Sequence, residues 1–340
     1  MFSSTSIRIL ALLSLAIVLL GLPRFNRNDW LIGSLTSQGK EAAVHLADAE
    51  KYIATVEWIR GRSSNGILYA PYSYRVLVPL LAAPLPFDSM TSINILNLLF
   101  LISTLILLYR LQRCLGIEER PALFGSALFV LSFPTFFYGT VGYIDPVFVF
   151  LLMLGLNLIY AKVWWAVALT IGLGLLGKEG TIMLVPAFGV ALWQEKRSWA
   201  QTFGWLFVTV SLWALLWYGT RSLIPVANQF QWSITLDQLL MNLSRLRSWL
   251  TMILTGVTLL LPFLVAFIRR RPLTKPSIKG VYAPLWTGLV VATGYYMYSW
   301  TSAYVDGRMF WPIYLFGIPI VIAMTTQSNR FTKSTSYSTS

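Results

Sequence analysis

The stretch VLVPLLAAPLP at residues 76–86 decides how this chain is threaded through a membrane. It is apolar, but it is much shorter than the roughly 20 residues that a helix needs to cross a hydrocarbon core. Prolines at positions 79, 84 and 86 also remove backbone donors that a continuous helix would use. We therefore predict a short interfacial or re-entrant helix here. A crossing would invert the orientation of every later segment.

The composition of the whole chain indicates a polytopic membrane protein. Hydrophobic residues make up 56% of the 340 positions and charged residues only 11%, which excludes a soluble domain with a polar shell. The apolar runs are continuous rather than alternating, so an outer-membrane barrel is not expected either. We predict an all-α transmembrane bundle that forms a single integral membrane domain over residues 1–340. The ten predicted spans cover residues 7–22, 91–110, 121–138, 146–161, 163–177, 180–193, 201–219, 249–268, 281–300 and 309–325.

The distribution of Lys and Arg predicts the orientation of the bundle. With the amino terminus inside, the inner segments carry fourteen bases and three acids, whereas the outer segments carry twelve bases and ten acids. The arginines at 269–271 are the strongest single inside signal. We predict an inner (plasma) membrane protein with both termini in the cytoplasm, and the first span as a retained anchor rather than a signal peptide. Because topology explains the basic surplus, nucleic acid is not expected as a partner.

Two outer segments, residues 23–90 and 220–248, are too long to be turns. Apolar residues recur at near-helical spacing between 42 and 59, which predicts an amphipathic helix on the outer interface. The same pattern recurs more weakly between 234 and 246. The Ser/Thr-rich tail at 331–340 is predicted to be disordered.

Only a few charged residues directly border the long apolar segments. On the predicted topology these residues all fall on the outer face of the membrane. Transfer of a sugar from a lipid phosphate needs a carboxylate that accepts a proton from the acceptor hydroxyl. It also needs cations that stabilise the departing phosphate, a task for which Arg is well suited. The candidates are Asp48, Arg75, Asp145, Lys178, Glu179, Asp306 and Arg308.

Three segments carry a resemblance to a known superfamily. HLADAEKYIATVEWIRGRSSNGILYAPYSYRVLVPLLAAPLP at 45–86 resembles the first outer loop of the GT-C superfamily, the membrane glycosyltransferases that use polyprenyl-phosphate-linked sugars. GLGLLGKEGTIMLVP at 172–186 is similar to the superfamily's helix pair with a lysine-bearing turn. DGRMFWPIYLF at 306–316 is similar to its late helix, which begins with Arg, aromatic residues and Pro.

The resemblance implies an activity and a set of site residues. It implies a lipid-linked sugar donor, a glycan, lipid or protein acceptor, and contact with membrane lipids. Asp48 matches the acidic position, Tyr52 the tyrosine that follows it, and Tyr74 with Arg75 the aromatic stretch. The catalytic acid of the superfamily usually follows the first span closely, which makes Asp29 a second candidate for the base beside Asp48.

Each candidate also has a purely structural explanation. Asp145 precedes a proline and could cap a helix, whereas Lys178 and Glu179 could neutralise each other in a turn. Arg75 could be an interfacial anchor, and the pair Asp306 and Arg308 a helix cap with an anchor. No grouping has the spacing of metal ligands, so a divalent cation, the one candidate cofactor, would depend on carboxylates.

Two alternative functions follow from the same sequence. A secondary transporter would show repeated halves and charges near the centres of spans. A non-catalytic polytopic protein of cell-envelope polysaccharide assembly would not need acids and bases gathered at one interface.

Overall fold

The computed structural model describes residues 3–27, 47–62, 68–229, 233–270, 272–273, 276 and 280–326. Within these residues the regular secondary structure is helical apart from two short strands, β1 (Tyr69–Ala70) and β2 (Asn228–Gln229), which pair in parallel. The all-α prediction is therefore confirmed. Asp29, the tail at 331–340 and the first part of the predicted outer helix lie outside the described residues.

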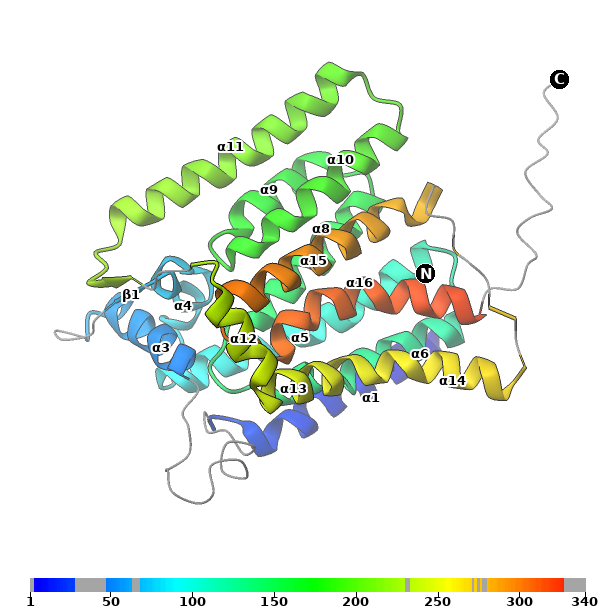
Figure 1. The fold of residues 1–340 in the computed structure, drawn as a ribbon, viewed down its shortest axis with the longest axis horizontal. Helices are drawn as coiled ribbons and strands as arrows, with labels where there is room; N and C mark the ends of the chain where they lie inside the picture. The colour runs from blue at the N-terminus through cyan, green and yellow to red at the C-terminus, as the bar shows by residue number, and fades with distance from the viewer. Residues whose placement is uncertain are drawn as a thin grey trace.

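Most of the helices form a bundle, and the others lie at one of its ends (Figure 1). Those of the bundle are α1 (Ser4–Gly21), α5 (Ser89–Cys114), α6 (Glu119–Val130), α7 (Phe133–Phe137), α8 (Asp145–Tyr160), α9 (Trp164–Gly174), α10 (Leu184–Gln194), α11 (Trp199–Leu223), α13 (Leu246–Gly256), α14 (Leu261–Ile268), α15 (Ala283–Ser302) and α16 (Gly307–Thr326). Those at the end are α3 (Ala47–Ile59), α4 (Leu77–Ala82) and α12 (Leu236–Ser244). Short 3-10 turns are η1 (Leu22–Arg24), η2 (Tyr72–Tyr74), η3 (Glu179–Met183), η4 (Val257–Leu260) and η5 (Gly280–Tyr282).

Among the described residues, five segments are long and apolar enough to cross a membrane. They are Ser4–Arg24, Ser89–Cys114, Trp199–Leu223, Leu246–Ile268 and Gly307–Thr326. Helices also lie at the other predicted spans, but they are shorter or less apolar. The predicted span 121–138 is divided at Ser132 into α6 and α7, and the predicted span 180–193 begins with the 3-10 turn η3. These segments support a membrane protein with several crossings.

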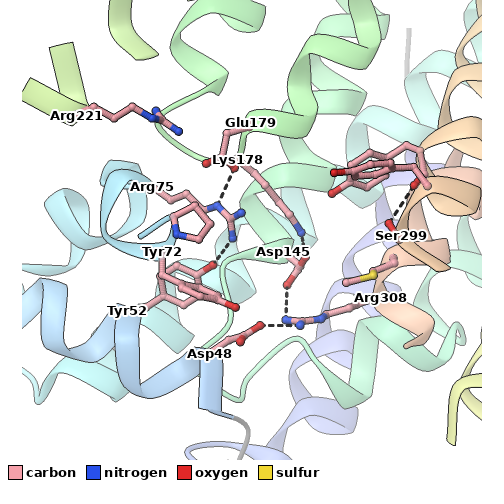
Figure 2. Close-up of a pocket in the computed structure, with 14 residues that line it drawn as sticks. Asp48, Tyr52, Tyr72, Arg75, Asp145, Lys178, Glu179, Arg221, Ser299 and Arg308 are labelled. Atoms are coloured by element: carbon pink, nitrogen blue, oxygen red, sulfur yellow. Dashed lines mark hydrogen bonds and ion pairs between the residues drawn. The ribbon is translucent and has the colours of Figure 1, made fainter. Parts of the chain in front are cut away.

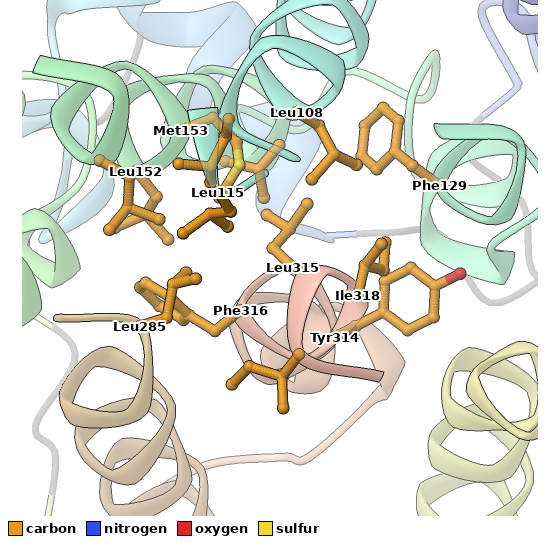
Figure 3. Close-up of a cluster of buried hydrophobic side chains, with 14 of the residues drawn as sticks. Leu108, Leu115, Phe129, Leu152, Met153, Leu285, Tyr314, Leu315, Phe316 and Ile318 are labelled. Atoms are coloured by element: carbon orange, nitrogen blue, oxygen red, sulfur yellow. The ribbon is translucent and has the colours of Figure 1, made fainter. Parts of the chain in front are cut away.

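Helix α16 lies at the centre of the main hydrophobic core (Figure 3). Its residues Leu315, Phe316 and Ile318 are fully buried among side chains of α5, α6, α8 and α15. The Tyr314 hydroxyl donates a hydrogen bond of 2.5 Å to the carbonyl of Leu128, so its polar atom is satisfied inside the core. A helix that is apolar on all sides is stable only when other helices surround it. The core therefore fixes the position at which α16 begins.

The two ends of the bundle differ in structure (Figure 1). Hydrogen bonds from Gln194 to Gly280 (2.8 Å) and from Tyr160 to Val281 (2.7 Å) join three turns at one end. That end carries the inner loops predicted from the Lys and Arg counts, and we call it the basic end. At the opposite end lie α3, α4, β1 and α12, and the Leu77 amide donates to the Leu176 carbonyl at 2.8 Å.

The segment that decides the topology does not cross the bundle. It forms α4, which has six residues and would rise only about 9 Å. Arg60 at the end of α3 donates to the carbonyls of Ala82, Ala83 and Leu85, which holds α4 against α3. The structure therefore has a short helix within 76–86, as the sequence predicts.

The amphipathic helix predicted in the first outer segment exists, but its apolar face does not lie free on the interface. Ala49, Tyr52 and Val56 are fully buried or nearly so, and α3 contacts α4, α5 and η2. The Thr55 hydroxyl donates to that of Ser73 at 3.1 Å. The sequence could not separate the two outcomes, because lipid and protein both cover an apolar stripe. Helix α3 is a wall at the end of the bundle.

Candidate functional site

A cavity of about 270 Å³ lies at the end of the bundle opposite the basic end (Figure 2). Side chains from α3, η2, α8, the α9–η3 turn, α11, α15 and α16 line it. Seven of the residues singled out in the sequence are among them: Asp48, Tyr52, Arg75, Asp145, Lys178, Glu179 and Arg308. The rest of the lining is Pro71, Tyr72, Arg221, Tyr295, Tyr298, Ser299 and Met309.

Arg308, the second residue of α16, joins three carboxylates. Its Nη2 lies 2.6 Å from Oδ2 of Asp48, and its Nη1 lies 3.6 Å from Oδ2 of Asp145. Its Nε lies 3.2 Å from Oδ1 of Asp306, although without the alignment of a hydrogen bond. The guanidinium also covers the ring of Tyr143 at 4.3 Å. With 14% of its side chain exposed, Arg308 is a buried ionic centre and not an interfacial anchor.

Asp145 is part of this network, so helix capping does not explain it. Ile144 is the N-cap of α8, and Asp145 is the first helical residue, with its side chain almost completely buried. Its Oδ1 forms an ion pair with Nζ of Lys178. A buried carboxylate costs several kcal/mol unless charges compensate it, and here Lys178 and Arg308 compensate it together.

Glu179 belongs to a second ionic group, centred on Arg75. Nε of Arg75 donates to Oε2 of Glu179 at 2.8 Å, and its Nη1 donates to the Tyr52 hydroxyl at 2.9 Å. Mutual neutralisation of Lys178 and Glu179 is therefore wrong, because each pairs with another residue. The reason is local geometry. Lys178 is extended at the N-cap of η3, so successive side chains point in different directions.

The carboxylates differ in their tendency to hold a proton. Burial raises the pKa of Asp48, but the guanidinium of Arg308 and the nearby hydroxyl of Tyr72 outweigh that effect, so the pKa lies below its usual value. Burial also raises the pKa of Asp306, and there the nearby cations Arg308 and Arg247 do not reverse it. Asp48 lines the cavity and is ionised. Asp306 lies behind Arg308, and its Oδ1 accepts from the Arg308 amide at 3.2 Å as a helix cap would.

The remaining predicted residues do not line the cavity. Tyr74 packs in an apolar cluster with Leu68, Val76 and Ile224, where the guanidinium of Arg221 covers its ring at 4.6 Å. Asp29 lies outside the described residues. Tyr74 therefore supports a cavity residue rather than contacting a ligand.

Arg221 is the main lining residue that the sequence interpretation missed. It lies in the last turn of α11, and its guanidinium stacks 3.8 Å from the ring centre of Trp217. In Figure 2 it lies across the cluster from Asp48, with Arg75 between them. Among the described residues, no carboxylate lies within ion-pair distance of Arg221. Its position in the last turn of a long apolar helix was the signal that could have identified it.

Because Gly307 has no side chain, α16 can begin close to α13. A Cβ at Gly307 would lie 2.4 Å from the Thr255 hydroxyl oxygen and 2.5 Å from the Thr251 carbonyl oxygen. We expect Gly307→Ala to lower the free energy of unfolding by about 1–3 kcal/mol and to displace Arg308. Thermal unfolding in detergent measures this loss. Gly294→Ala in α15 is the matched control, since nothing lies within 4 Å of its Cβ. Equal melting temperatures would contradict the close approach.

No group of three His, Cys, Asp or Glu side chains among the described residues is placed to hold a metal ion. Arg308 itself occupies the space between Asp48, Asp145 and Asp306. In this structure a guanidinium thus lies between the three carboxylates, and Lys178 supplies a second positive charge to Asp145.

Comparison with protein-family models and with curated proteins finds no match for this chain. The chemistry of the cavity therefore carries the assignment of function. Four cations line it, Arg75, Lys178, Arg221 and Arg308, against three carboxylates, Asp48, Asp145 and Glu179. The lining has one positive charge in excess, which favours an anionic ligand.

Proposed function

We propose that this protein is an integral membrane glycosyltransferase that moves a sugar from a polyprenyl-phosphate donor to an acceptor hydroxyl. The observation that carries the proposal is that the carboxylate of Asp48 lines the same cavity as an excess of cations. A transferase of this kind needs both a base for the acceptor and cations for the leaving phosphate. The acceptor is a glycan, a lipid or a protein.

The residues suggest one reaction sequence. Asp48 accepts the proton of the acceptor hydroxyl while the hydroxyl oxygen forms a bond to the anomeric carbon of the sugar. The bond from that carbon to the phosphate oxygen breaks, and polyprenyl phosphate leaves with the electron pair. Cations beside the phosphate oxygens stabilise the charge that develops there.

Arg221 is the best placed of the cations to bind that phosphate. Arg75, Lys178 and Arg308, the phosphate partners expected from the sequence, each already pair with a carboxylate. The guanidinium of Arg221 is held by the rings of Trp217 and Tyr74 and has no such partner among the described residues. A stacked arginine loses little conformational freedom when it binds a phosphate.

The proposed membrane position follows from the charge of the two ends. We place the basic end in the cytoplasm of the inner (plasma) membrane, with both termini on that side, and all ten helical segments as crossings. The surplus of Lys and Arg at the basic end supports this orientation. The cavity then opens on the extracytoplasmic face, where a lipid-linked sugar would meet it.

Binding of polyprenyl phosphate tests the proposal without knowledge of the sugar, because polyprenyl phosphate is released whichever sugar is transferred. We expect it to raise the melting temperature of the purified protein, whereas polyprenol without phosphate does not. Arg221→Gln should weaken binding about tenfold or more, the usual value of a hydrogen bond to a charged group. The control is Arg245→Gln, because Arg245 stacks on the ring of Tyr304 and does not line the cavity. No stabilisation, or equal stabilisation by polyprenol, would contradict the proposal.

A secondary transporter is the alternative of a different class. Its substrate site would lie near the membrane midplane, at interrupted helices. Here Asp145 and Arg308 lie in the first turns of α8 and α16, and Asp48 lies at the start of α3. Ionic groups at helix ends on one side of the bundle favour a reaction at a membrane face.

A further inference from the structure

A second cavity lies at the basic end, between α10, α11 and α15. Its volume is about 630 Å³, and its walls are almost entirely apolar, including Val190, Phe203 and Leu206. Helix α11 lies along the edge of the bundle and packs on α9 and α10 (Figure 1). Gly189 leaves room in the wall, because the nearest atom to a Cβ there would be Leu206 Cδ1 at 3.6 Å. We call this cavity the apolar groove.

The apolar groove opens into a mouth lined by cations. A neighbouring cavity of about 240 Å³ shares Trp193, Trp199 and Thr202 with the groove and adds Lys196 and Arg197. The two Trp rings contact each other edge to face at 4.9 Å and remain 65% and 62% exposed. Tryptophan pairs of this kind are typical of the level of lipid headgroups.

The charges at the mouth are available to a ligand. Glu195, the acid next to them in sequence, pairs with Lys162 at 2.7 Å. Among the described residues, no carboxylate lies within ion-pair distance of Lys196 or Arg197. The backbone holds both near the groove, since Lys196 follows the C-cap of α10 in a left-handed conformation (φ 52°) and Ser198 caps α11. The site therefore combines an apolar groove with two positive charges that have no carboxylate partner among the described residues.

We propose that the apolar groove binds one anionic glycerophospholipid of the cytoplasmic leaflet. An acyl chain would fill the groove, and the phosphate would lie between Lys196 and Arg197 at the level of Trp193 and Trp199. A zwitterionic lipid would supply the chain, but its ammonium group would meet two cations. This site lies at the opposite end of the bundle from Asp48, so it does not depend on the proposed reaction.

Native mass spectrometry of the full-length protein in detergent, titrated with dioleoyl phosphatidylglycerol or dioleoyl phosphatidylcholine, tests this proposal. We expect the wild type to hold one phosphatidylglycerol at concentrations that leave phosphatidylcholine unbound. The double variant Lys196→Gln with Arg197→Gln should weaken phosphatidylglycerol binding at least tenfold, because the loss of each positive charge should weaken it about fivefold. Gly189→Leu should remove the bound lipid by filling the groove.

Matched controls separate this site from general attraction to the basic end. Arg269→Gln with Arg270→Gln removes the same charge from exposed residues at the end of α14. Gly204→Leu adds the same side chain to α11 where nothing lies within 4 Å. Both should bind as the wild type does. Equal binding of the two lipids, or an equal effect of the control variants, would overturn the proposal. Displacement of phosphatidylglycerol from the wild type by equimolar polyprenyl phosphate, with no polyprenyl phosphate bound to Gly189→Leu, would assign the groove to an isoprenoid chain instead.

Discussion

Asp48→Asn should reduce the rate of sugar transfer at least a hundredfold while leaving the fold intact. Asparagine keeps the shape of the side chain but cannot accept a proton, and a positioned general base contributes roughly 10²- to 10⁴-fold. Arg308 would still hold Asp145 and Asp306, so no buried charge is left without a partner. The measurement is kcat in proteoliposomes supplied with a panel of radiolabelled polyprenyl-phosphate sugars. The loss should appear in kcat with little change in KM.

Two further variants make this result decisive. Glu50→Gln removes a carboxylate from the exposed side of the same helix and should transfer sugar as the wild type does. Asp29→Asn tests the second aspartate named from the sequence. Full activity in Asp48→Asn together with a lost reaction in Asp29→Asn would show that Asp29 is the base. A wild type that transfers no sugar from any donor in the panel would contradict the proposed activity itself.

Arg308→Gln should be the most destabilising single change at the cavity. It leaves the carboxylates of Asp48, Asp145 and Asp306 facing one another without their shared cation. Loss of one partner from a buried ion pair costs about 3–5 kcal/mol. We therefore expect a large fall in melting temperature at neutral pH and loss of sugar transfer. Arg308→Lys should restore only part of either, because one ammonium cannot replace a guanidinium that contacts three carboxylates.

The pH dependence of the Arg308→Gln variant identifies the cause of its instability. In the wild type the folded-state pKa of Asp48 is lowered, so this residue stabilises the fold above the unfolded pKa of about 3.9. That contribution is lost only as the pH falls through the lower, folded-state pKa. Without the cation, burial would raise the folded-state pKa above the unfolded value. The ionised carboxylate of Asp48 would then destabilise the fold at neutral pH, and its protonation at lower pH would remove that destabilisation.

The measurement is the melting temperature between pH 7 and about pH 5. The melting temperature of Arg308→Gln should approach that of the wild type as the pH falls. Arg110→Gln, an exposed change at the basic end of α5, should melt at the wild-type temperature at both pH values. A difference in melting temperature that does not change with pH would mean that lost packing, and not unpaired carboxylates, destabilises Arg308→Gln.

Much of the candidate site could be recognised from the sequence because ionisable residues are rare in an apolar chain. A charge beside a long apolar run is costly unless it has a partner or a task. That reasoning identified Asp48, Arg75, Lys178 and Arg308, which the structure gathers in one cavity. It did not identify Arg221, because a single arginine at the end of a helix is also typical of an interfacial anchor.

The pairing of these residues could not be predicted. Lys178 precedes Glu179 in sequence, yet it binds Asp145, and Glu179 binds Arg75. Asp145 was the candidate most easily explained as a helix cap, and it is among the most buried members of the network. An ion pair depends on a few ångströms between helices that are far apart in the chain, and composition contains no information at that scale.

The sequence by itself determined that this is an all-α membrane protein and which of its ends is basic. Those properties are sums over segments, since each apolar run and each cluster of Lys and Arg acts by its own hydropathy or charge. Only the tertiary structure decided that α3 lines the cavity, that Arg308 joins three carboxylates, and that Arg221 lines the same cavity. Packing between the helices fixes these contacts, because a buried helix has one position in which its neighbours fill the space around it.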